Sequence, residues 1–517
     1  MKTLTLDGTS LSLADLAPLL DEDLGGEGPR LKLKIARSAM KRVREARRLV
    51  ERHVKAGNVV YGLTTGFGKL KSVAIEGEDL ETLQRNLILS HCCGVGEPLP
   101  LREVRAAQVL RLNGLVRGHS GVAPATVEKL VRLFNVGFVP EVPSQGSVGA
   151  SGDLAPLSEM AATYMGHGWA WVGGKRRRAR AALKAVGEVP LVLQAKEGLA
   201  LINGTEVMKA VGVLTWLRAA NLSRAADAVA SLSLEALFGS LAPFDDRLAV
   251  LKGHAGHRRT AANFRQLLEG SGVLESHSDC DRVQDPYCLR CIPQVHGAFK
   301  EALAHVGEVL AGEVNAVTDN PILFPDTEEV ISAGQFHGQP VSMVMDYLAL
   351  ATATLANISE RRVEQLVNPD LSGLPAFLTP EPGLNSGFMI AQVAAASLAS
   401  ENKSLAHPAS VDTVPTSANQ EDHVSMGTIA ARKARGVLEN TERVLAIELV
   451  CAAQGREFHS EIEAGPGARA ARLALRSHVR PLAADRYLRD DLDAAHRLLA
   501  SGELIAAVED ACGALEA

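Results

Sequence analysis

Long alanine-rich segments without internal proline constrain this chain more than any other feature of its sequence. Five of them have the apolar spacing of helices, at about 205–241, 294–317, 342–367, 385–406 and 424–453. In the second, apolar residues recur every three or four positions: Phe299, Leu303, Val306, Leu310, Val314 and Val317. Helices of this length bury their apolar stripes against one another, so the sequence predicts a mainly α protein with a long central helical bundle.

The part of the chain before these helices has a different character. Residues 1–204 mix shorter helical patterns with glycine-punctuated loops. Within them, 165–195 is typical of a small excursion that contains strands, and its basic run Lys175–Arg178 is expected to be a solvated face. We therefore expect a smaller N-terminal domain over 1–204, followed by the bundle and a C-terminal helical segment over 205–517.

Composition excludes several classes of function. Lys and Arg number 54 and Asp and Glu 60, a net charge of 54 − 60 = −6, and no long basic block is present. This balance argues against nucleic acid or an anionic membrane surface as a partner. The N-terminus lacks the apolar core of a signal peptide, and no apolar run of about 18 residues is present, so we expect no membrane span.

Cysteine and histidine placement bears on the compartment and on metals. The seven cysteines are odd in number and irregularly spaced, and the pair Cys288 and Cys291 has no second pair at zinc-site spacing. This pattern favours reduced thiols in the cytoplasm. The histidines are scattered without metal spacing, so we expect no metal.

A glycine-dense turn, Gly146–Gly152, precedes a predicted helix and contains Ala150-Ser151-Gly152. In a tight turn the nitrogen of Gly152 can attack the carbonyl carbon of Ala150, and loss of water from Ser151 then leaves an exocyclic methylidene on a five-membered ring. Glycine leaves its nitrogen unshielded and permits strained backbone angles. Taken alone, however, the tripeptide predicts only a flexible turn that caps a helix, because Ala-Ser-Gly is common.

Other segments carry polar or aromatic residues that a helical bundle does not need: Tyr61–Gly68, Gly198–Thr205, Gln284–Arg290, Asn315–Pro321 and Gly334–Gly338. Together with Gly146–Glu159, and in this order, they resemble the motifs of the aromatic amino acid ammonia-lyases. The resemblance runs from about residue 55 to about 430. It implies the helical bundle of the fumarase/aspartase-like superfamily, although the serine-rich signature loop of the fumarase-like lyases is not visible. It also implies a homotetramer whose active sites are shared between subunits.

The resemblance also implies a cofactor and the residues around it. The cofactor is 4-methylideneimidazol-5-one (MIO), made from Ala150-Ser151-Gly152. Asn203 resembles the residue that donates a hydrogen bond to the ring oxygen, although an asparagine before glycine is also a common loop or cap residue. Tyr61 resembles the catalytic base. As a phenolate it would need a pKa depressed by nearby positive charge or donors, and the alternative is a tyrosine packed on the surface.

Four further residues take their roles from the same resemblance. Arg290 has the planar fork that matches a substrate carboxylate, or else it is a helix-end arginine paired with Asp285. Tyr287 is counted with the catalytic residues, and Gln284 with those that line the cofactor and hold the substrate. Phe336 would pack on the cofactor ring, and a buried core phenylalanine is an equal alternative.

His91 and Glu421 point to the substrate. Ser90-His91 and Glu421 resemble the histidine-specific branch of the family, which deaminates L-histidine to trans-urocanate and ammonia. Imidazole has one donor and one acceptor that a histidine and a carboxylate can satisfy, and a phenyl ring would leave both unpaired. Taken singly, His91 is more often a partly buried histidine with its partners satisfied, and Glu421 a capping acid ahead of the 424–453 helix. The alternative function is a tyrosine ammonia-lyase or tyrosine 2,3-aminomutase with the same cofactor.

Overall fold

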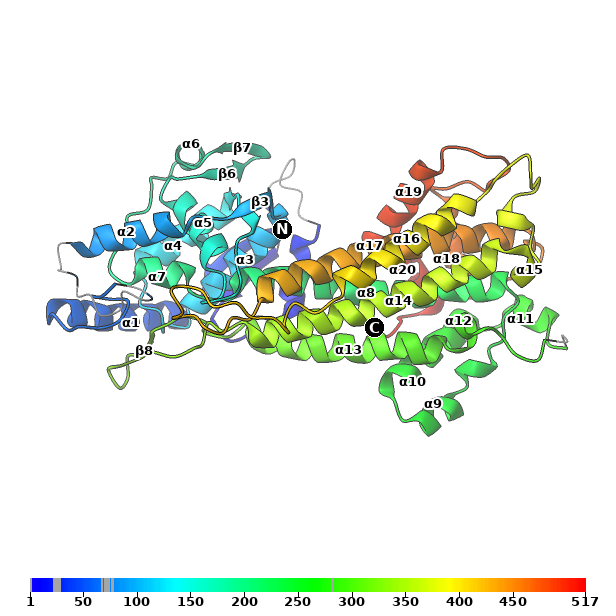
Figure 1. Cartoon of the computed structure of the whole chain (residues 1–517), viewed down its shortest axis with the longest axis horizontal. Coiled ribbons are helices and arrows are strands. Elements are labelled where there is room, and N and C mark those ends of the chain that lie inside the picture. Colours follow the sequence, from blue (N-terminus) through cyan, green and yellow to red (C-terminus); the bar gives the residue numbers. More distant parts are fainter. Residues whose placement is uncertain (1, 22–28, 67, 69–74, 76–78, 280–281) are drawn as a thin grey trace. The chain divides into compact units, whose positions relative to one another are not determined.

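The computed structural model describes residues 2–21, 29–66, 68, 75, 79–279 and 282–517 (Figure 1). Two residues considered above lie outside these ranges: Phe67, which belongs to the motif segment Tyr61–Gly68, and Cys280. The chain forms two compact units. The first comprises 1–214, 307–346 and 408–432, and the second comprises 215–306, 347–407 and 433–517.

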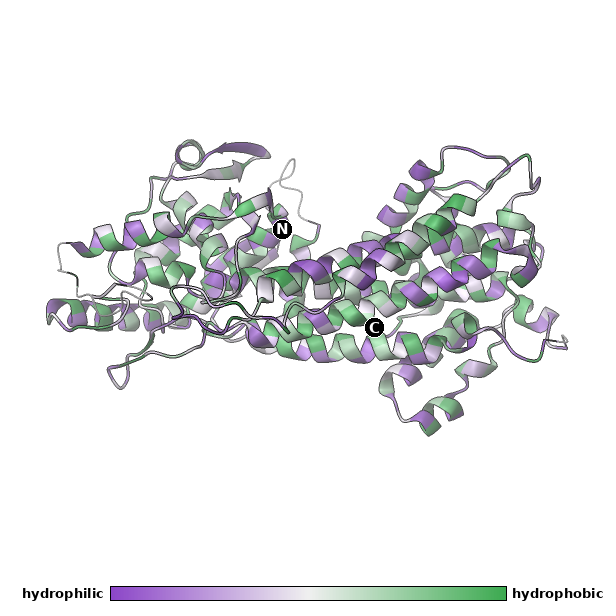
Figure 2. Ribbon diagram, viewed as in Figure 1, coloured by the Kyte–Doolittle hydropathy of each residue, from purple (hydrophilic) through white to green (hydrophobic). Residues whose placement is uncertain are grey.

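The five predicted long helices are present, and the prediction of a mainly α fold is confirmed. They are α8 (Glu206–Ala236), α13 (Ile292–Glu313), α14 (Gln339–Val367), α16 (Met389–Leu405) and α17 (Gly427–Glu457). Their apolar and polar residues alternate in patches along each helix (Figure 2), as expected of helices that pack on several neighbours. All except α16 contribute residues to both units.

The first unit combines short helices with small sheets. Its shorter helices are α1 (Arg37–Lys55), α2 (Leu80–His91), α3 (Leu101–Leu115), α4 (Pro124–Asn135), α5 (Leu154–Tyr164), α6 (Ala179–Ala185) and α7 (Glu197–Ile202). Strand β1 (Lys2–Leu6) pairs in parallel with β2 (Leu31–Ile35). The other sheets are antiparallel: β3 (Val95–Pro98) with β5 (Pro143–Gln145), β4 (Val139–Pro140) with β6 (Trp169–Val172) and β7 (Lys175–Arg178), and β8 (Ile322–Phe324) with β9 (Glu329–Ile331).

The predicted excursion with strands over 165–195 is the β6–β7 hairpin followed by α6. All four basic residues of β7 are exposed, and β7 is uniformly hydrophilic in Figure 2. Two of them lie against the β6 tryptophan: the guanidinium carbons of Arg176 and Arg178 are 3.9 and 4.2 Å from the Trp169 ring centroid. The basic run is a solvated face, as predicted, and two of its guanidinium groups lie over the Trp169 ring.

Helix α3 organises the polar interior of the first unit. Its residues from Glu103 to Leu115 are all buried, although five of them are polar: Glu103, Arg105, Gln108, Arg111 and Asn113. Buried polar groups require partners, and several of these side chains bond the backbone of neighbouring elements. Gln108 donates to the carbonyl oxygen of Phe138 at 3.1 Å, and Asn113 donates to that of Val314 at 3.0 Å. The helix thus fixes loops as well as filling the core.

The second unit contains α16, most of the long helices and several shorter ones. The shorter helices are α9 (Asp246–Lys252), α10 (Ala255–Leu267), α11 (Gly272–Ser276), α12 (Tyr287–Arg290), α15 (Pro369–Ser372), α18 (Pro466–Arg476), α19 (Leu488–Ala500) and α20 (Glu503–Cys512). Among the described helices, α14 alone is long and apolar enough to cross a membrane by length and composition, but 67% of its most apolar stretch is buried inside the protein. Such burial is typical of a core helix.

Candidate active site

The turn that contains Ala150-Ser151-Gly152 lies just before α5, and three glycines give it its shape. Gly146, Gly149 and Gly152 have φ angles of +121°, +75° and +76°, which favour glycine. A Cβ on Gly152 would lie 2.0 Å from the carbonyl oxygen of Gly204. No side chain fits there, so the close approach of the two segments requires glycine at 152.

Backbone hydrogen bonds hold this turn against the end of α7 and the start of α17. The Gly204 N–H donates to the Ser151 carbonyl oxygen at 3.2 Å, and the Asp153 N–H donates to the Gly204 carbonyl oxygen at 2.7 Å. On the other side, the Met426 N–H donates to the Val148 carbonyl oxygen at 2.9 Å. The turn is therefore held tightly from both sides, which is the condition for bringing the nitrogen of one residue onto a neighbouring carbonyl.

Asp153 ties the turn to the first turn of α8. Its carboxylate is fully buried and accepts hydrogen bonds from the N–H groups of Val207 and Met208, both at 2.9 Å, and from the Thr428 hydroxyl. Burial raises the pKa of this carboxyl to about 6, and the hydrogen bonds oppose the rise. A carboxylate at a helix N-terminus is favoured by the helix dipole, so Asp153 caps α8 while it orients the turn.

A cavity of about 510 Å³ in the first unit opens over the turn. Six of the residues predicted for the site line it: Tyr61, His91, Ser151, Asn203, Phe336 and Glu421. They come from segments that are up to 360 residues apart in the chain, counting from Tyr61 to Glu421 (421 − 61 = 360). Ala150 and Gly152 flank Ser151 beneath this cavity. Convergence of several polar groups on one concave site is the usual mark of a binding or catalytic site.

Glu421 reaches Ser151 directly. The Ser151 hydroxyl donates to one carboxylate oxygen of Glu421 at 3.3 Å, and the Thr416 hydroxyl donates to the other at 2.8 Å. His91 ends α2, with its Nδ1 3.1 Å from the Ser90 hydroxyl oxygen. Burial lowers the pKa of His91, and the Leu87 carbonyl and Glu421 oppose the change only in part. At neutral pH this imidazole is uncharged, and it offers one donor and one acceptor.

Asn203 is the C-cap of α7 and is 2% exposed. Its side-chain nitrogen donates to the Asn320 carbonyl oxygen at 3.0 Å, but its side-chain oxygen is buried and has no hydrogen-bond partner among the described residues. An unpaired buried amide oxygen costs about 1–3 kcal/mol, so such a group at a cavity wall is suited to a ligand.

Tyr61 differs from what its predicted role requires. The Gly68 N–H lies 3.4 Å from the Tyr61 hydroxyl oxygen and by itself favours the phenolate. Burial is the larger effect and raises that pKa, and the negative charges of Glu421 and Asp319 raise it further. Within the described part of the chain, the groups around Tyr61 therefore keep the phenol protonated, and the depressed pKa expected of a base is not produced by this environment.

Gln284, Tyr287 and Arg290 belong to the second unit. Gln284 and Arg290 line a cavity of about 450 Å³ there, and Tyr287 is 70% exposed. The Arg290 Nε donates to the carbonyl oxygen of Asp285 at 2.9 Å, and its guanidinium carbon is 4.3 Å from the Tyr287 ring centroid. The alternative prediction of a contact between Arg290 and Asp285 is thus met by the backbone of Asp285 rather than by its carboxylate.

The sequence model of the aromatic amino acid lyase family matches residues 12–477. This chain belongs to the aromatic amino acid lyase family. Among similar relatives, the histidine ammonia-lyase of Symbiobacterium thermophilum is 56% identical over 92% of this chain and 94% of its own, and that of Natranaerobius thermophilus is 50% identical over 94% and 96%.

Solved structures of ammonia-lyases and aminomutases have the same fold as this lyase. Histidine ammonia-lyase from Trypanosoma cruzi is 41% identical over 98% of this chain and 95% of its own, with a TM-score of 0.91. Tyrosine aminomutase from Streptomyces globisporus is 34% identical over the whole of both chains, with a TM-score of 0.93. The fold is therefore shared by enzymes whose names differ in both substrate and outcome, and specificity must lie in the site.

Some residues of this lyase that shape the cavity were missed by the sequence interpretation. Asn320, Ser332 and Gln420 line the cavity, and Asp153 and Arg111 support its floor. Asn320 lies within a motif segment, but nothing in the sequence distinguishes Arg111 from other polar residues of an amphipathic helix. Among the residues that the structure describes, no group of three or more His, Cys, Asp or Glu side chains is arranged to hold a metal. The absence of a metal stays a prediction.

Proposed function

We propose that this lyase removes ammonia from L-histidine without oxidation and releases trans-urocanate. The observation that carries the proposal is the convergence of Ser151, His91 and Glu421 on one cavity. The histidine ammonia-lyase relatives, about 50% identical over nearly the full chain, support it.

The electrophile would be MIO, formed from the chain itself. The Gly152 nitrogen bonds to the Ala150 carbonyl carbon, whose oxygen leaves as water, and the Ser151 hydroxyl leaves as a second water with the Ser151 α-hydrogen. The tight turn fits this ring, because Gly152 lies against Gly204 with no room for a side chain. Once formed, the methylidene would supply an electrophile for the substrate amine, and this would make the amine nitrogen a better leaving group. The Ser151 carbonyl oxygen becomes the ring oxygen, and the Gly204 N–H already donates to it.

The cavity residues have complementary roles in this proposal. Neutral His91 and the Glu421 carboxylate hold the two nitrogens of the substrate imidazole. With its amide turned so that the nitrogen rather than the unpaired oxygen faces the ring, Asn203 donates to the ring oxygen as negative charge develops there. Tyr61 removes the β-proton, and Phe336 packs on the ring.

We also propose that Gln284, Tyr287 and Arg290 act in the site of another subunit of a homotetramer. Their exposure supports this arrangement: Tyr287 is 70% exposed and its neighbour Val283 is 98% exposed. Arg290 would bind the substrate carboxylate, and a cation brought in this way would lower the pKa of Tyr61. Complementation tests the arrangement. Ser151→Ala and Arg290→Met chains, each inactive alone, should regain activity when co-expressed, and no recovery would contradict the shared site.

The remaining parts of the proposal concern domains, location and partners. We propose that 1–204 is the domain that carries the cofactor-forming turn and that 205–517 is the bundle with its C-terminal segment. Free thiols at all six described cysteines support a cytoplasmic location. The partner is a small amino acid rather than nucleic acid or a membrane.

A substrate assay separates this function from its alternative. The full-coverage similarity to a tyrosine aminomutase favours testing tyrosine as a second substrate. Purified protein is mixed with L-histidine or L-tyrosine, urocanate and coumarate are followed by absorbance, and a β-amino acid is sought by chromatography. We expect urocanate from histidine and little product from tyrosine. Absence of urocanate would contradict the proposal. Intact mass should be two waters below the encoded mass.

A further inference from the structure

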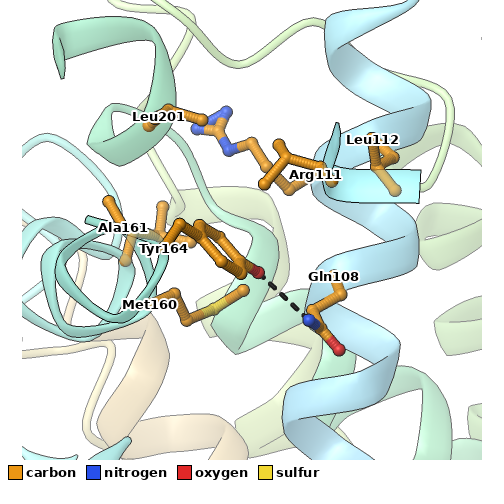
Figure 3. A pocket seen from close by; sticks show the side chains of 9 residues that line it. Gln108, Arg111, Leu112, Met160, Ala161, Tyr164 and Leu201 are labelled. Carbon is orange, nitrogen blue, oxygen red and sulfur yellow. Dashed lines mark hydrogen bonds between the residues drawn. The ribbon is translucent and has the colours of Figure 1, made fainter. Parts of the chain in front are cut away.

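The carbonyl group of Asn203 is held by a buried arginine from α3. The Arg111 side chain is 7% exposed, and its Nη1 and Nη2 atoms donate to the Asn203 carbonyl oxygen at 3.2 and 2.6 Å. Figure 3 shows this side chain extending from α3 toward Leu201 on α7, beside a buried cavity of only about 10 Å³. Two donors of one cation on a single carbonyl make a strong, charge-assisted contact.

The same peptide group carries the donor that faces the proposed cofactor. The Asn203 carbonyl and the Gly204 N–H belong to one planar peptide unit. Arg111 binds the oxygen of this unit. The Gly204 N–H of the same unit donates to the Ser151 carbonyl oxygen at 3.2 Å. The guanidinium and the Ser151 oxygen therefore lie at opposite ends of one conjugated amide.

We propose that Arg111 is a positioning residue that polarises the Asn203–Gly204 peptide. Its positive charge draws electron density toward the Asn203 oxygen, and this makes the Gly204 N–H a stronger donor. Hydrogen bonds in series strengthen one another, by about 10–30% per bond in condensed phases. The strengthened N–H points at the oxygen that becomes the ring oxygen, where negative charge develops. This inference rests on the proposed function, because it assigns a role toward the ring.

The surroundings of Arg111 fix it in this position. Its Nη2 is 3.3 Å from a carboxylate oxygen of Glu206, and the other oxygen of Glu206 accepts from the Thr318 hydroxyl at 2.9 Å. Burial would raise the pKa of Glu206, but Arg111 and Lys209 hold it below its ordinary value, so the carboxylate stays charged. A Cβ on Gly204 would lie 2.4 Å from Glu206 and 2.8 Å from the Arg111 Nη2, so glycine leaves room for the guanidinium.

A purely structural role is the alternative, because Asn203 caps the C-terminus of α7 and cations are favoured at helix C-termini. The two roles make different predictions. A structural arginine changes stability and the yield of folded protein. A polarising arginine also changes kcat for each ring formed, and the absorption band of the ring, since that band responds to hydrogen bonding at the ring oxygen.

The test compares Arg111→Met and Arg111→Lys with a matched control, Arg105→Met. Arg105 is a fully buried arginine of the same helix that donates to the Phe134 carbonyl oxygen at 2.7 Å, away from the turn. Intact mass gives the fraction of chains with the ring, near-ultraviolet absorbance gives its band, and histidine turnover gives kcat and KM. We expect Arg111→Met to lose about tenfold or more in kcat per ring with little change in KM. Its band should shift, and Arg111→Lys should lie between it and wild type.

The outcomes separate the inference from the function beneath it. A wild-type chain without the loss of two waters would overturn both. A wild-type chain with the ring, and an Arg111→Met variant with unchanged kcat and band, would overturn the inference alone. Equal losses in Arg105→Met would also overturn it. A ring that is missing from both Arg111 variants but present in Arg105→Met would support it, because the same N–H stabilises negative charge on the Ser151 carbonyl oxygen while the Ser151 α-hydrogen is removed during ring formation.

Discussion

A buried ion pair in the second unit of this lyase and the cavity in the first unit differ in how completely their polar groups are paired. In the second unit, the carboxylate of Glu448 is fully buried and accepts from Arg362 at 2.6 and 2.9 Å and from the hydroxyls of Ser233 and Ser359, both at 2.6 Å. Each carboxylate oxygen has two donors. A carboxylate with this many donors has no free acceptor position for a ligand.

The cavity of the first unit is the contrast. Asn203 has a buried side-chain oxygen without a partner among the described residues, and Tyr61 is a protonated phenol in an environment that raises its pKa. Glu421 accepts a hydrogen bond from Ser151, whose hydroxyl would be lost when the ring forms. Fully paired buried charges stabilise or specify a fold, whereas incompletely paired polar groups at a cavity are available to a substrate. Pairing, more than burial, therefore distinguishes the Glu448 cluster from this cavity.

Ser151→Ala should have the largest effect on activity and almost none on the fold. Without the hydroxyl the methylidene cannot form, so turnover should fall by more than about a thousandfold, in the range that loss of a catalytic serine causes elsewhere. The variant should have the full encoded mass and an unchanged melting temperature. The control is Ser158→Ala in α5, whose hydroxyl donates to the Leu154 carbonyl oxygen of its own helix at 2.7 Å. Full turnover by Ser151→Ala would show that the electrophile is wrong.

Glu448→Gln should have the opposite effect: it should lower the stability of the fold and leave the activity of the folded protein almost unchanged. It leaves the Arg362 guanidinium buried without its counter-charge, which costs about 3–5 kcal/mol of unfolding free energy. Denaturant unfolding measures the loss, and kcat of the remaining folded protein should be close to wild type. Asp493→Asn breaks an exposed pair with Arg489 in the same unit and should cost less than about 1 kcal/mol. Equal losses of unfolding free energy in Glu448→Gln and Asp493→Asn would show that the buried ion pair stabilises the fold no more than the exposed pair does.

The sequence was sufficient for the helical part of this fold. Apolar spacing placed the helix observed at Ile292–Glu313 within a few residues, and the stripe from Phe299 to Val314 is buried. Period and proline placement determine such elements locally. The resemblance also brought together Tyr61, His91, Ser151, Asn203, Phe336 and Glu421, which line one cavity.

The sequence did not predict the hydrogen bonds between distant segments of the chain. Arg111 and Asn203 are 92 residues apart, and Asp153 and Val207 are 54 apart. No local pattern records such pairs, because each depends on how distant segments approach. The pKa of Tyr61 is similar: its direction depends on burial and on Glu421 and Asp319, far away in the chain. Side-chain roles that rest on tertiary electrostatics need the structure.

Glu421→Gln tests whether the Glu421 carboxylate in the cavity determines the preference for histidine. Loss of the carboxylate removes a charge-assisted partner for the substrate imidazole, worth about 1.5–3 kcal/mol, so kcat/KM for histidine should fall roughly 10- to 150-fold. The ratio of histidine to tyrosine turnover should fall with it. Asp422→Asn changes the neighbouring exposed carboxylate and should leave both unchanged. If Glu421→Gln kept its preference for histidine, Glu421 would be a structural acid rather than a specificity residue.

Asp153 gives the smallest effect, and it appears as a pH dependence. Its folded-state pKa is about 6, above the ordinary value of 3.8, because the carboxyl is fully buried. Between these values the folded chain binds more protons than the unfolded chain, so the contribution of Asp153 to stability is present below pH 3.8 and is lost as pH rises through 6. Lowering the pH from 7 to 5 should therefore stabilise wild type by about 1 kcal/mol relative to Asp153→Asn. Melting temperatures of the two proteins at both pH values measure this difference. A constant gap would mean that the α8 N-terminus and Thr428 keep the carboxylate charged in both states, and that Asp153 belongs with the fully paired charges such as Glu448.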